Sequence, residues 1–360
     1  MMRKILMMLL ACALLAVAAA AAGGAEDPLA SLSYLTGAFT SALDTEVDRR
    51  LDESDRMISE GGVDLGTASE GAAVWTETRL KRGDLLTAST GTGALLLAGE
   101  GQIAITGGAV VDVTTGREVP SGSAMVVNHR YLAAEDTSAT FIVTSKTAVM
   151  SYQGPCGITE SGDVDYNAMA AALKQLNLFR GTFTGYGEGY DLEKAPTRLQ
   201  ALIMFIRVLG EEEQALAWTG TTPFTDVARG SEAEKYVGYA YEQGYTNGFS
   251  ATKFRPGSAV NAYQYTEFVL RAMGYSSAAN TNLADTLDRA RISGVLTAGE
   301  TAAIRADKFL RADLVYISYY ALDALMPAGD RTLGQTLAEQ GVFTERDWLE
   351  AKTLVTSSRM

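Results

Sequence analysis

The feature that most constrains this chain is a short pattern in its C-terminal half that recurs with decay. The pattern is most complete at residues 224–274, where two runs with helical spacing flank a glycine-containing turn. Residues 195–210 align with the second half of this unit, and residues 310–322 align with that half again. A unit of helix, turn and helix is too small to bury its apolar face alone. We therefore expect three copies within residues 164–330 to share one core.

The second helix of each copy is indicated by apolar residues at the i, i+3, i+4, i+7 and i+8 positions. This spacing places apolar side chains of all three copies on one helix face: Ala201, Met204, Phe205, Val208 and Leu209, then Tyr265, Phe268, Val269, Ala272 and Met273, then Leu314, Ile317, Ala321 and Leu322. We assign these side chains to core packing.

The starts of these helices carry the residues with the most chemistry. Thr197 and Gln200 have capping-box spacing, in which a hydroxyl and an amide each take one free backbone N–H group. Asn261 and Gln264 repeat this spacing and are expected to complete the box less fully. Arg198 lies inside the first cap, where free N–H groups and the positive end of the helix dipole favour an anion. An arginine there can hold a carboxylate or phosphate through two hydrogen bonds, so the sequence predicts an anion site.

Four short motifs of the middle copy, taken in order, resemble an S-layer homology (SLH) repeat. They are Phe-Thr-Asp-Val at 224–227, Gly-Tyr-Thr-Asn-Gly at 244–248, Phe-Arg-Pro at 254–256 and Arg-Ala-Met-Gly at 271–274. That family anchors proteins to the bacterial cell wall. The resemblance, with its weaker copies, covers about half of the chain, and it makes Asp226 and Gly248 motif-supporting residues.

The SLH resemblance also implies which residues bind a ligand. The family carries Thr-Arg-Ala-Glu at the start of the second helix, and its Arg is implied to bind an anionic, often pyruvylated, secondary cell-wall polysaccharide. Here the motif reads Thr-Arg-Leu-Gln at 197–200, Asn-Ala-Tyr-Gln at 261–264 and Leu-Arg-Ala-Asp at 310–313. Arg198 and Arg311 are therefore the expected polysaccharide-binding residues, with Asp313 as a supporting residue.

The middle copy departs from the family pattern. Ala262 stands where the arginine is expected, and Glu232 stands where the family usually has a Trp. Binding is therefore expected at the first and third copies. An alternative remains open, in which Arg198 and Arg311 are ordinary surface charges that pair with nearby acids.

The N-terminus predicts export. Arg3 and Lys4, an apolar run to about Ala20 and a small-residue exit are typical of a secretory signal peptide, here residues 1–25. Cys12 resembles a lipoprotein cysteine only loosely, because it lies in the middle of the apolar run. No later stretch is long and apolar enough to cross a bilayer, so we expect no integral membrane segment in the mature chain. The predicted location is secreted, at the cell wall or cell surface (S-layer).

The chain is expected to be multi-domain. After a helical N-terminal segment at residues 26–60, short β-type runs punctuated by glycine turns predict an all-β module, sandwich- or jelly-roll-like, at residues 72–153. The SLH-like domain at 164–330 is expected to be all-α, and a C-terminal helical segment follows at 331–360.

Composition argues against several kinds of chemistry. The chain has one histidine, His129, and after signal removal its sole cysteine is Cys156, in a turn-like link. One histidine cannot form a histidine-rich metal site, so we expect no metal and no cofactor. The formal net charge of −13 disfavours nucleic acid as a partner.

These observations favour a secreted, non-catalytic envelope protein, anchored non-covalently to secondary cell-wall polysaccharide or another anionic wall polymer, that displays the β-module. Two alternatives stay open. In the first, degenerate repeats form a protein-interaction or sensory scaffold. In the second, the protein is a wall-active hydrolase, although its many acids form no recognisable catalytic motif.

Export should remove the signal after Ala22 or Ala25, because both follow a small-residue exit. Mass spectrometry of the mature N-terminus tests this expectation. A lipid-modified chain that begins at Cys12 would contradict it.

Overall fold

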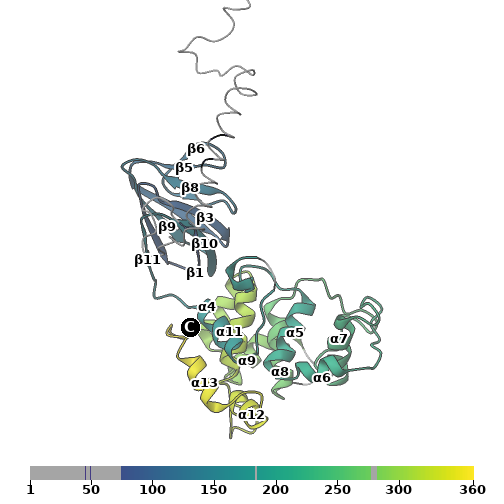
Figure 1. Cartoon of the computed structure of the whole chain (residues 1–360). Coiled ribbons are helices and arrows are strands. Elements are labelled where there is room, and N and C mark those ends of the chain that lie inside the picture. The colour runs from purple at the N-terminus through teal and green to yellow at the C-terminus, as the bar shows by residue number, and fades with distance from the viewer. Residues whose placement is uncertain (1–44, 46–48, 50–73, 183–184, 277–281) are drawn as a thin grey trace, which may run out of the picture. The chain divides into compact units, whose positions relative to one another are not determined.

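The computed structural model describes residues 45, 49, 74–182, 185–276 and 282–360. The expected signal peptide and almost all of the expected segment 26–60 lie outside these residues. Met1–Ala72 and Ala73–Met360 are separate units, and the second contains a β-sheet region followed by a helical region (Figure 1).

The β region consists of two antiparallel sheets. One has the strand order β1, β10, β3, β8, β5, β6, and the other has the order β11, β2, β9, β4, β7. The strands are β1 (Thr76–Lys81), β2 (Leu85–Ser89), β3 (Gly93–Ala98), β4 (Gly101–Gly107), β5 (Val110–Asp112), β6 (Arg117–Val119), β7 (Ser123–Ala124), β8 (Arg130–Ala133), β9 (Ser138–Val143), β10 (Thr147–Gln153) and β11 (Cys156–Thr159).

Alternation along the strands produces the core of the β region. In β9, every second residue is buried, because successive side chains of a strand point to opposite faces. Leu86, Leu96, Ile103 and Phe141 are fully buried in one cluster that draws on both sheets. The Gly-Pro context of Cys156 predicted a turn-like link. The structure instead places Cys156 at the start of β11, opposite Ala88 of β2. The β region therefore extends to Thr159.

The helical region contains the second helices expected of the repeats. α5, α8 and α11 are each 11 residues long and begin at Arg198, Ala262 and Arg311. The helices are α4 (Tyr166–Gln175), α5 (Arg198–Val208), α6 (Glu212–Ala217), α7 (Glu232–Glu242), α8 (Ala262–Ala272), α9 (Thr286–Ile292), α10 (Ala298–Ala306), α11 (Arg311–Ala321), α12 (Leu333–Glu339) and α13 (Glu345–Lys352).

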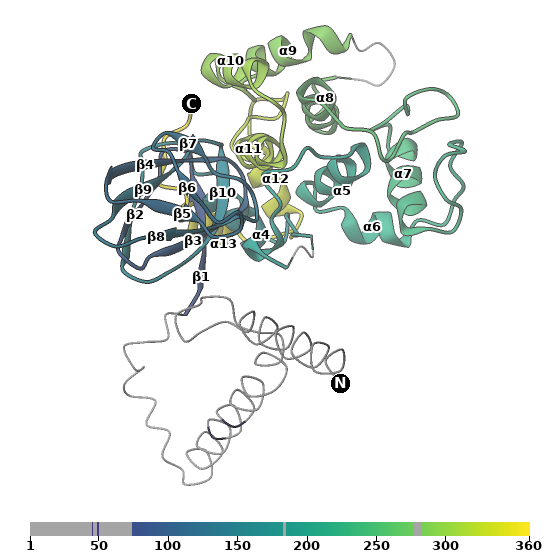
Figure 2. The same ribbon diagram turned by 90° about the horizontal axis from the view of Figure 1, so that it is seen from above.

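Helices of different copies pack on one another, an arrangement that we call exchanged packing. α5, α8 and α11 contact one another, whereas α7 packs on α5, α9 on α8 and α4 on α11 (Figure 2). The first helix of each copy thus packs on the second helix of another copy. This exchange brings the loop of one copy to the helix start of another.

One hydrophobic cluster runs through the whole helical region. It includes Phe205, Phe268 and Ile317 from the three central helices. It also includes Leu337 of α12 and Trp348 of α13, so residues beyond 330 contribute to the same core.

A fragment of residues 220–276 should not fold, because it removes α5 from α7 and removes α9 and α11 from α8. Circular dichroism with urea titration tests this expectation. Cooperative unfolding of the fragment as a monomer would contradict the exchanged packing.

Candidate functional site

The Arg198 site is built from two copies. The backbone N–H of Arg198 donates to the Ser258 carbonyl at 2.8 Å, and that of Leu199 donates to the Pro256 carbonyl at 3.1 Å. In return, the N–H of Val260 donates to the Pro196 carbonyl at 3.0 Å. The start of α5 is therefore fixed against the loop of the middle copy.

This pairing corrects the expected helix-end anion site. The remaining early N–H groups also have partners within the protein, because Gln200 donates to the Thr197 hydroxyl at 3.2 Å and Ala201 to the Thr197 carbonyl at 2.9 Å. The backbone N–H groups at the start of α5 are thus used by protein acceptors. A ligand at this site has to bind the side chain of Arg198.

The Arg198 side chain is nearly buried, at 8% exposure. Its guanidinium lies 5.0 Å from the ring centroid of Phe254 and 5.7 Å from that of Phe268. Nη2 makes two long hydrogen bonds, at 3.3 Å to the Gly248 carbonyl and 3.5 Å to the Thr246 hydroxyl, while Nε has no partner. The two phenylalanines were not identified from the sequence as part of a site, although Phe254 belongs to a quoted motif.

Arg198 is a buried cation without a carboxylate partner among the described residues. Burial lowers the pKa of Arg198 to about 10, and the nearby Arg271 adds to this effect. The alternative of an ordinary surface charge paired with an acid is therefore wrong for Arg198. A buried charge without an ion pair is costly to keep in a fold, and among the described residues two aromatic rings and two long hydrogen bonds are the cation–π and polar contacts of the Arg198 guanidinium.

Gly248 and Asp226 shape the loop that faces Arg198. Gly248 has φ +77°, and a Cβ there would lie 2.2 Å from Cε1 of Phe224, so the turn requires glycine. The Asp226 carboxylate accepts from the N–H groups of Phe254 and Arg255, each at 2.9 Å. Burial opposes ionisation of Asp226, but these two hydrogen bonds hold its pKa below the usual value.

The Arg311 site repeats this arrangement with other partners. The N–H of Arg311 donates to the Lys194 carbonyl at 2.9 Å, and that of Ala312 donates to the Leu192 carbonyl at 3.1 Å. The guanidinium lies 6.0 Å from the Phe179 ring centroid, and the residue is 6% exposed. Within the described ranges, its side chain makes no hydrogen bond or ion pair, so it is not a paired surface charge either.

Asp313 anchors the start of α11. Its carboxylate accepts from the Leu310 N–H at 2.7 Å and pairs with Lys146 of the β9–β10 turn at 2.8 Å. Burial raises the pKa of Asp313, and Lys146 opposes this rise. Asp313 therefore supports the helix start and does not point to a ligand of its own.

The middle copy contributes a loop and no arginine. Its helix start has a complete capping box, contrary to the expectation, because Gln264 N–H donates to Asn261 Oδ1 at 3.0 Å and Asn261 N–H donates to Gln264 Oε1 at 3.3 Å. Ala262 is buried at the position that Arg198 and Arg311 occupy. Glu232 begins α7 and is exposed to solvent.

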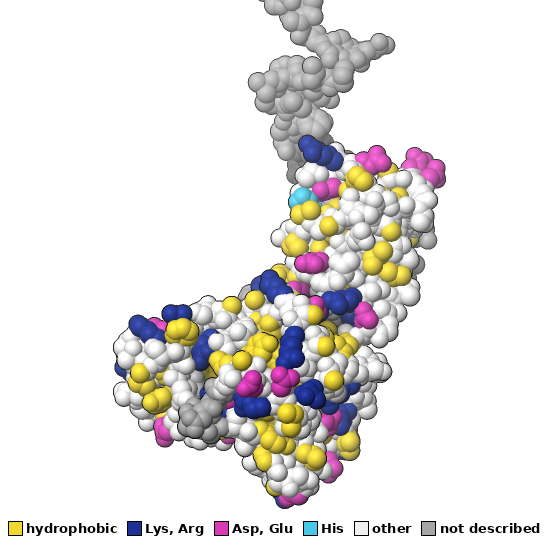
Figure 3. Space-filling model, turned by 180° about the vertical axis from the view of Figure 1, so that it is seen from behind, with side chains coloured by type: hydrophobic (Ala, Val, Ile, Leu, Met, Phe, Trp, Pro, Cys, Tyr) yellow, Lys and Arg dark blue, Asp and Glu magenta, His cyan; other side chains and the backbone are white. Residues whose placement is uncertain are grey.

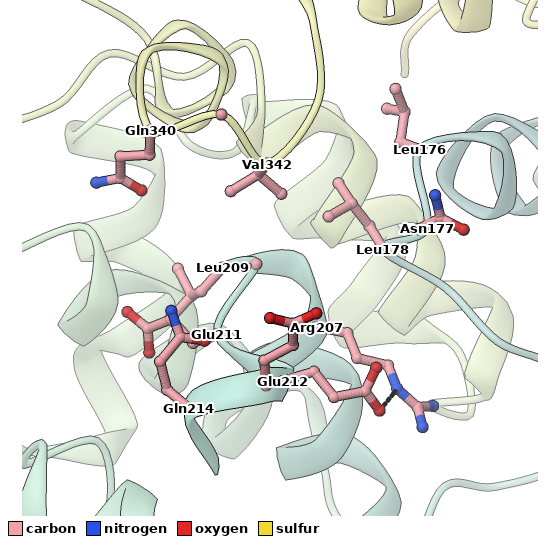
Figure 4. Close-up of a pocket in the computed structure, with 13 residues that line it drawn as sticks. Leu176, Asn177, Leu178, Arg207, Leu209, Glu211, Glu212, Gln214, Gln340 and Val342 are labelled. Atoms are coloured by element: carbon pink, nitrogen blue, oxygen red, sulfur yellow. Dashed lines mark hydrogen bonds and ion pairs between the residues drawn. The ribbon is translucent and has the colours of Figure 1, made fainter. Parts of the chain in front are cut away.

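A pocket of about 540 Å³ lies at the other end of α5 (Figure 4). Glu212 there accepts from Arg207 and from the Tyr236 hydroxyl, each at 2.7 Å. Burial raises the pKa of Glu211, against the lowering effect of its hydrogen bonds from two tyrosines. The carboxylates of Glu211 and Glu212 disfavour an anion in this pocket, which therefore differs in chemistry from the arginine sites.

Surface charge is mixed around these sites. Basic and acidic side chains interleave over the visible face of the helical region (Figure 3). Long-range fields of opposite sign cancel over such a surface and are screened by salt, so this face has no extended field of one sign.

No group of three or more His, Cys, Asp or Glu side chains that could hold a metal lies among residues 74–182, 185–276 and 282–360. His129 pairs with Asp112 at 2.8 Å just before β8. In the same ranges, no helix is long and apolar enough to cross a membrane.

Residues 223–261 match the S-layer homology domain family. A cell surface protein of Thermoanaerobacter kivui is 28% identical over 140 residues, which are 38% of this chain and 18% of that protein. The matched segment supplies the loop that faces Arg198, and the arginine itself comes from the preceding copy.

Two solved structures are also similar in part. A dTDP-6-deoxy-D-glucose-3,5-epimerase of Legionella pneumophila is 19% identical and covers 27% of this chain and 53% of its own, with a TM-score of 0.17. Procruciferin of Brassica napus is 12% identical and covers 28% of each chain, with a TM-score of 0.16. At these scores neither structure supports an argument about this protein.

The helical region thus contains an S-layer homology domain. This domain and the similarity to a cell surface protein support a place for the protein in the cell envelope, at the cell surface or in the cell wall.

Arg198→Met should stabilise the ligand-free protein by about 1 kcal/mol, because it replaces an uncompensated buried charge with an apolar chain. Arg289→Met is the contrasting variant. It removes the 2.5 Å ion pair with buried Glu267 and should destabilise by about 1.5–3 kcal/mol. Urea unfolding of the two variants tests the opposite signs. Equal destabilisation by both changes would mean that Arg198 is an ordinary structural residue.

Proposed function

We propose that this protein is exported and anchors non-covalently to an anionic wall polymer, such as a secondary cell-wall polysaccharide, through Arg198 and Arg311. The SLH-like copies form the anchor, the β-module is displayed by it as a sandwich, and the protein has no catalytic role.

The observation that carries the proposal is that Arg198 and Arg311 have similar surroundings. Both are more than nine-tenths buried, lie at the start of a central helix and form no ion pair or hydrogen bond with a carboxylate of the described residues. A carboxylate or phosphate group on a polymer would supply the missing charge and accept two hydrogen bonds from one guanidinium.

The exchanged packing supports a repeat architecture for the anchor. Each arginine faces a loop from another copy, so one intact site needs two copies. Ala262 leaves the site at the middle helix without a cation. Two cationic sites on one chain would bind a polymer with repeated anionic groups more tightly than either alone.

Arg198→Ala should weaken binding of the full mature chain to polymer-bearing sacculi by roughly tenfold or more. A charge-assisted hydrogen bond is worth about 1.5–3 kcal/mol, and about 1.4 kcal/mol corresponds to one decade. Arg311→Ala should act in the same direction. Co-sedimentation across a range of protein concentrations measures both changes.

Arg346→Ala is the matched control, because Arg346 is a highly exposed residue whose side chain pairs with Glu350 on α13. It should sediment like the parent, as surface pairs contribute little. Sacculi stripped of their anionic polymers should bind no variant. If both site variants sediment like the parent while folded by circular dichroism, the anchoring proposal fails and the interaction-scaffold hypothesis replaces it.

A further inference from the structure

The loop that faces Arg311 carries two acids, unlike the loop that faces Arg198. Asp191 and Glu193 flank Leu192, whose carbonyl accepts from the start of α11. Glu193 also precedes Lys194, whose carbonyl accepts from the Arg311 N–H, so Glu193 lies at the start of α11. Burial lowers the pKa of Arg311, and both carboxylates oppose this lowering. The corresponding loop at Arg198, residues 254–258, contains no acid.

Both acids are held by other groups. Asp191 accepts from the Thr182 hydroxyl and pairs with Lys194 at 3.0 Å. Glu193 pairs with Arg79 of β1 at 2.5 Å, and both side chains are more than nine-tenths buried. Both acids thus have cationic partners other than Arg311, and Glu193 is the more firmly held, because Asp191 Oδ1 makes no hydrogen bond.

Arg79 is itself held firmly. Its Nε donates to Asn167 Oδ1 of α4 at 2.8 Å, and its Nη1 donates to the Gly187 carbonyl at 2.9 Å. The Gly187 N–H donates to the Glu77 carboxylate of β1 at 2.6 Å. A Cβ on Gly187 would lie 2.5 Å from Nη1 of Arg79, so the segment packs directly on β1.

We propose that Arg79 of the β region is a positioning residue for the Arg311 site, which it keeps open to an external anion by holding Glu193 away from Arg311. This inference rests on the proposed function for its binding consequence. The β region is then part of the third-copy site and not only a displayed module. The Arg198 site needs no such help.

A stability cycle tests the inference without any ligand. In the parent, Arg311→Met should raise the urea midpoint, because it removes an unpaired buried cation. In an Arg79→Gln background, Glu193 is free to pair with Arg311, so Arg311→Met should lower the midpoint. The same sign in both backgrounds would overturn the proposal.

Binding to polymer-bearing sacculi supplies the second readout. Arg79→Gln should weaken binding nearly as much as Arg311→Ala, by roughly tenfold, and should add little in an Arg311→Ala background. Arg79→Gln with Glu193→Gln should restore binding, because no carboxylate is left to occupy Arg311. Arg82→Gln is the control for loss of one positive charge, since Arg82 is half-exposed and lies 3.8 Å from Asp307.

The outcomes separate the two proposals. If the double variant binds as weakly as Arg79→Gln alone, the positioning role is wrong even when Arg311→Ala weakens binding. If Arg311→Ala leaves binding unchanged, the proposed function fails at this site, and the sign of the stability cycle still decides whether Arg79 keeps Glu193 away from Arg311.

Discussion

The helical region depends on an exchange of packing partners between its copies. α7 packs on α5, α9 on α8 and α4 on α11, while the three second helices contact one another. Each first helix has a packing partner in another copy, so we expect the copies to fold together. The same exchange places each loop against the helix start of another copy, and it thereby creates the two arginine sites.

Those sites hold charges that the fold does not neutralise. The other two buried cations among the described residues have acidic partners, since Lys81 pairs with Asp84 and Lys146 with Asp313. Arg198 instead lies between two aromatic rings with an unpartnered Nε, and Arg311 lies beside acids that other cations hold. Two buried arginines without an ion pair, at equivalent positions of the fold, are consistent with binding sites. Features that lower the stability of a fold are expected mainly where function requires them.

The sequence predicted the local features and a shared core, but not which copies pack together. Capping spacing at Thr197 and Asn261 identified two helix starts, because caps are fixed by residues three apart. The loop opposite each arginine could not be predicted, because local spacing does not encode which copies pack together. α10 was missed although Thr297 and Glu300 have capping-box spacing. The contact of Arg79 with Glu193 joins residues far apart in sequence, and no local pattern indicates it.

The central claim is that the buried arginines bind an anion directly. Side-chain NMR of the arginine Nε–H groups in the full mature chain, during titration with polymer released from sacculi, tests this most directly. The account predicts that the signals of Arg198 and Arg311 shift with a common saturation curve while that of exposed Arg346 stays in place. Saturable binding with unmoved Arg198 and Arg311 signals would contradict it.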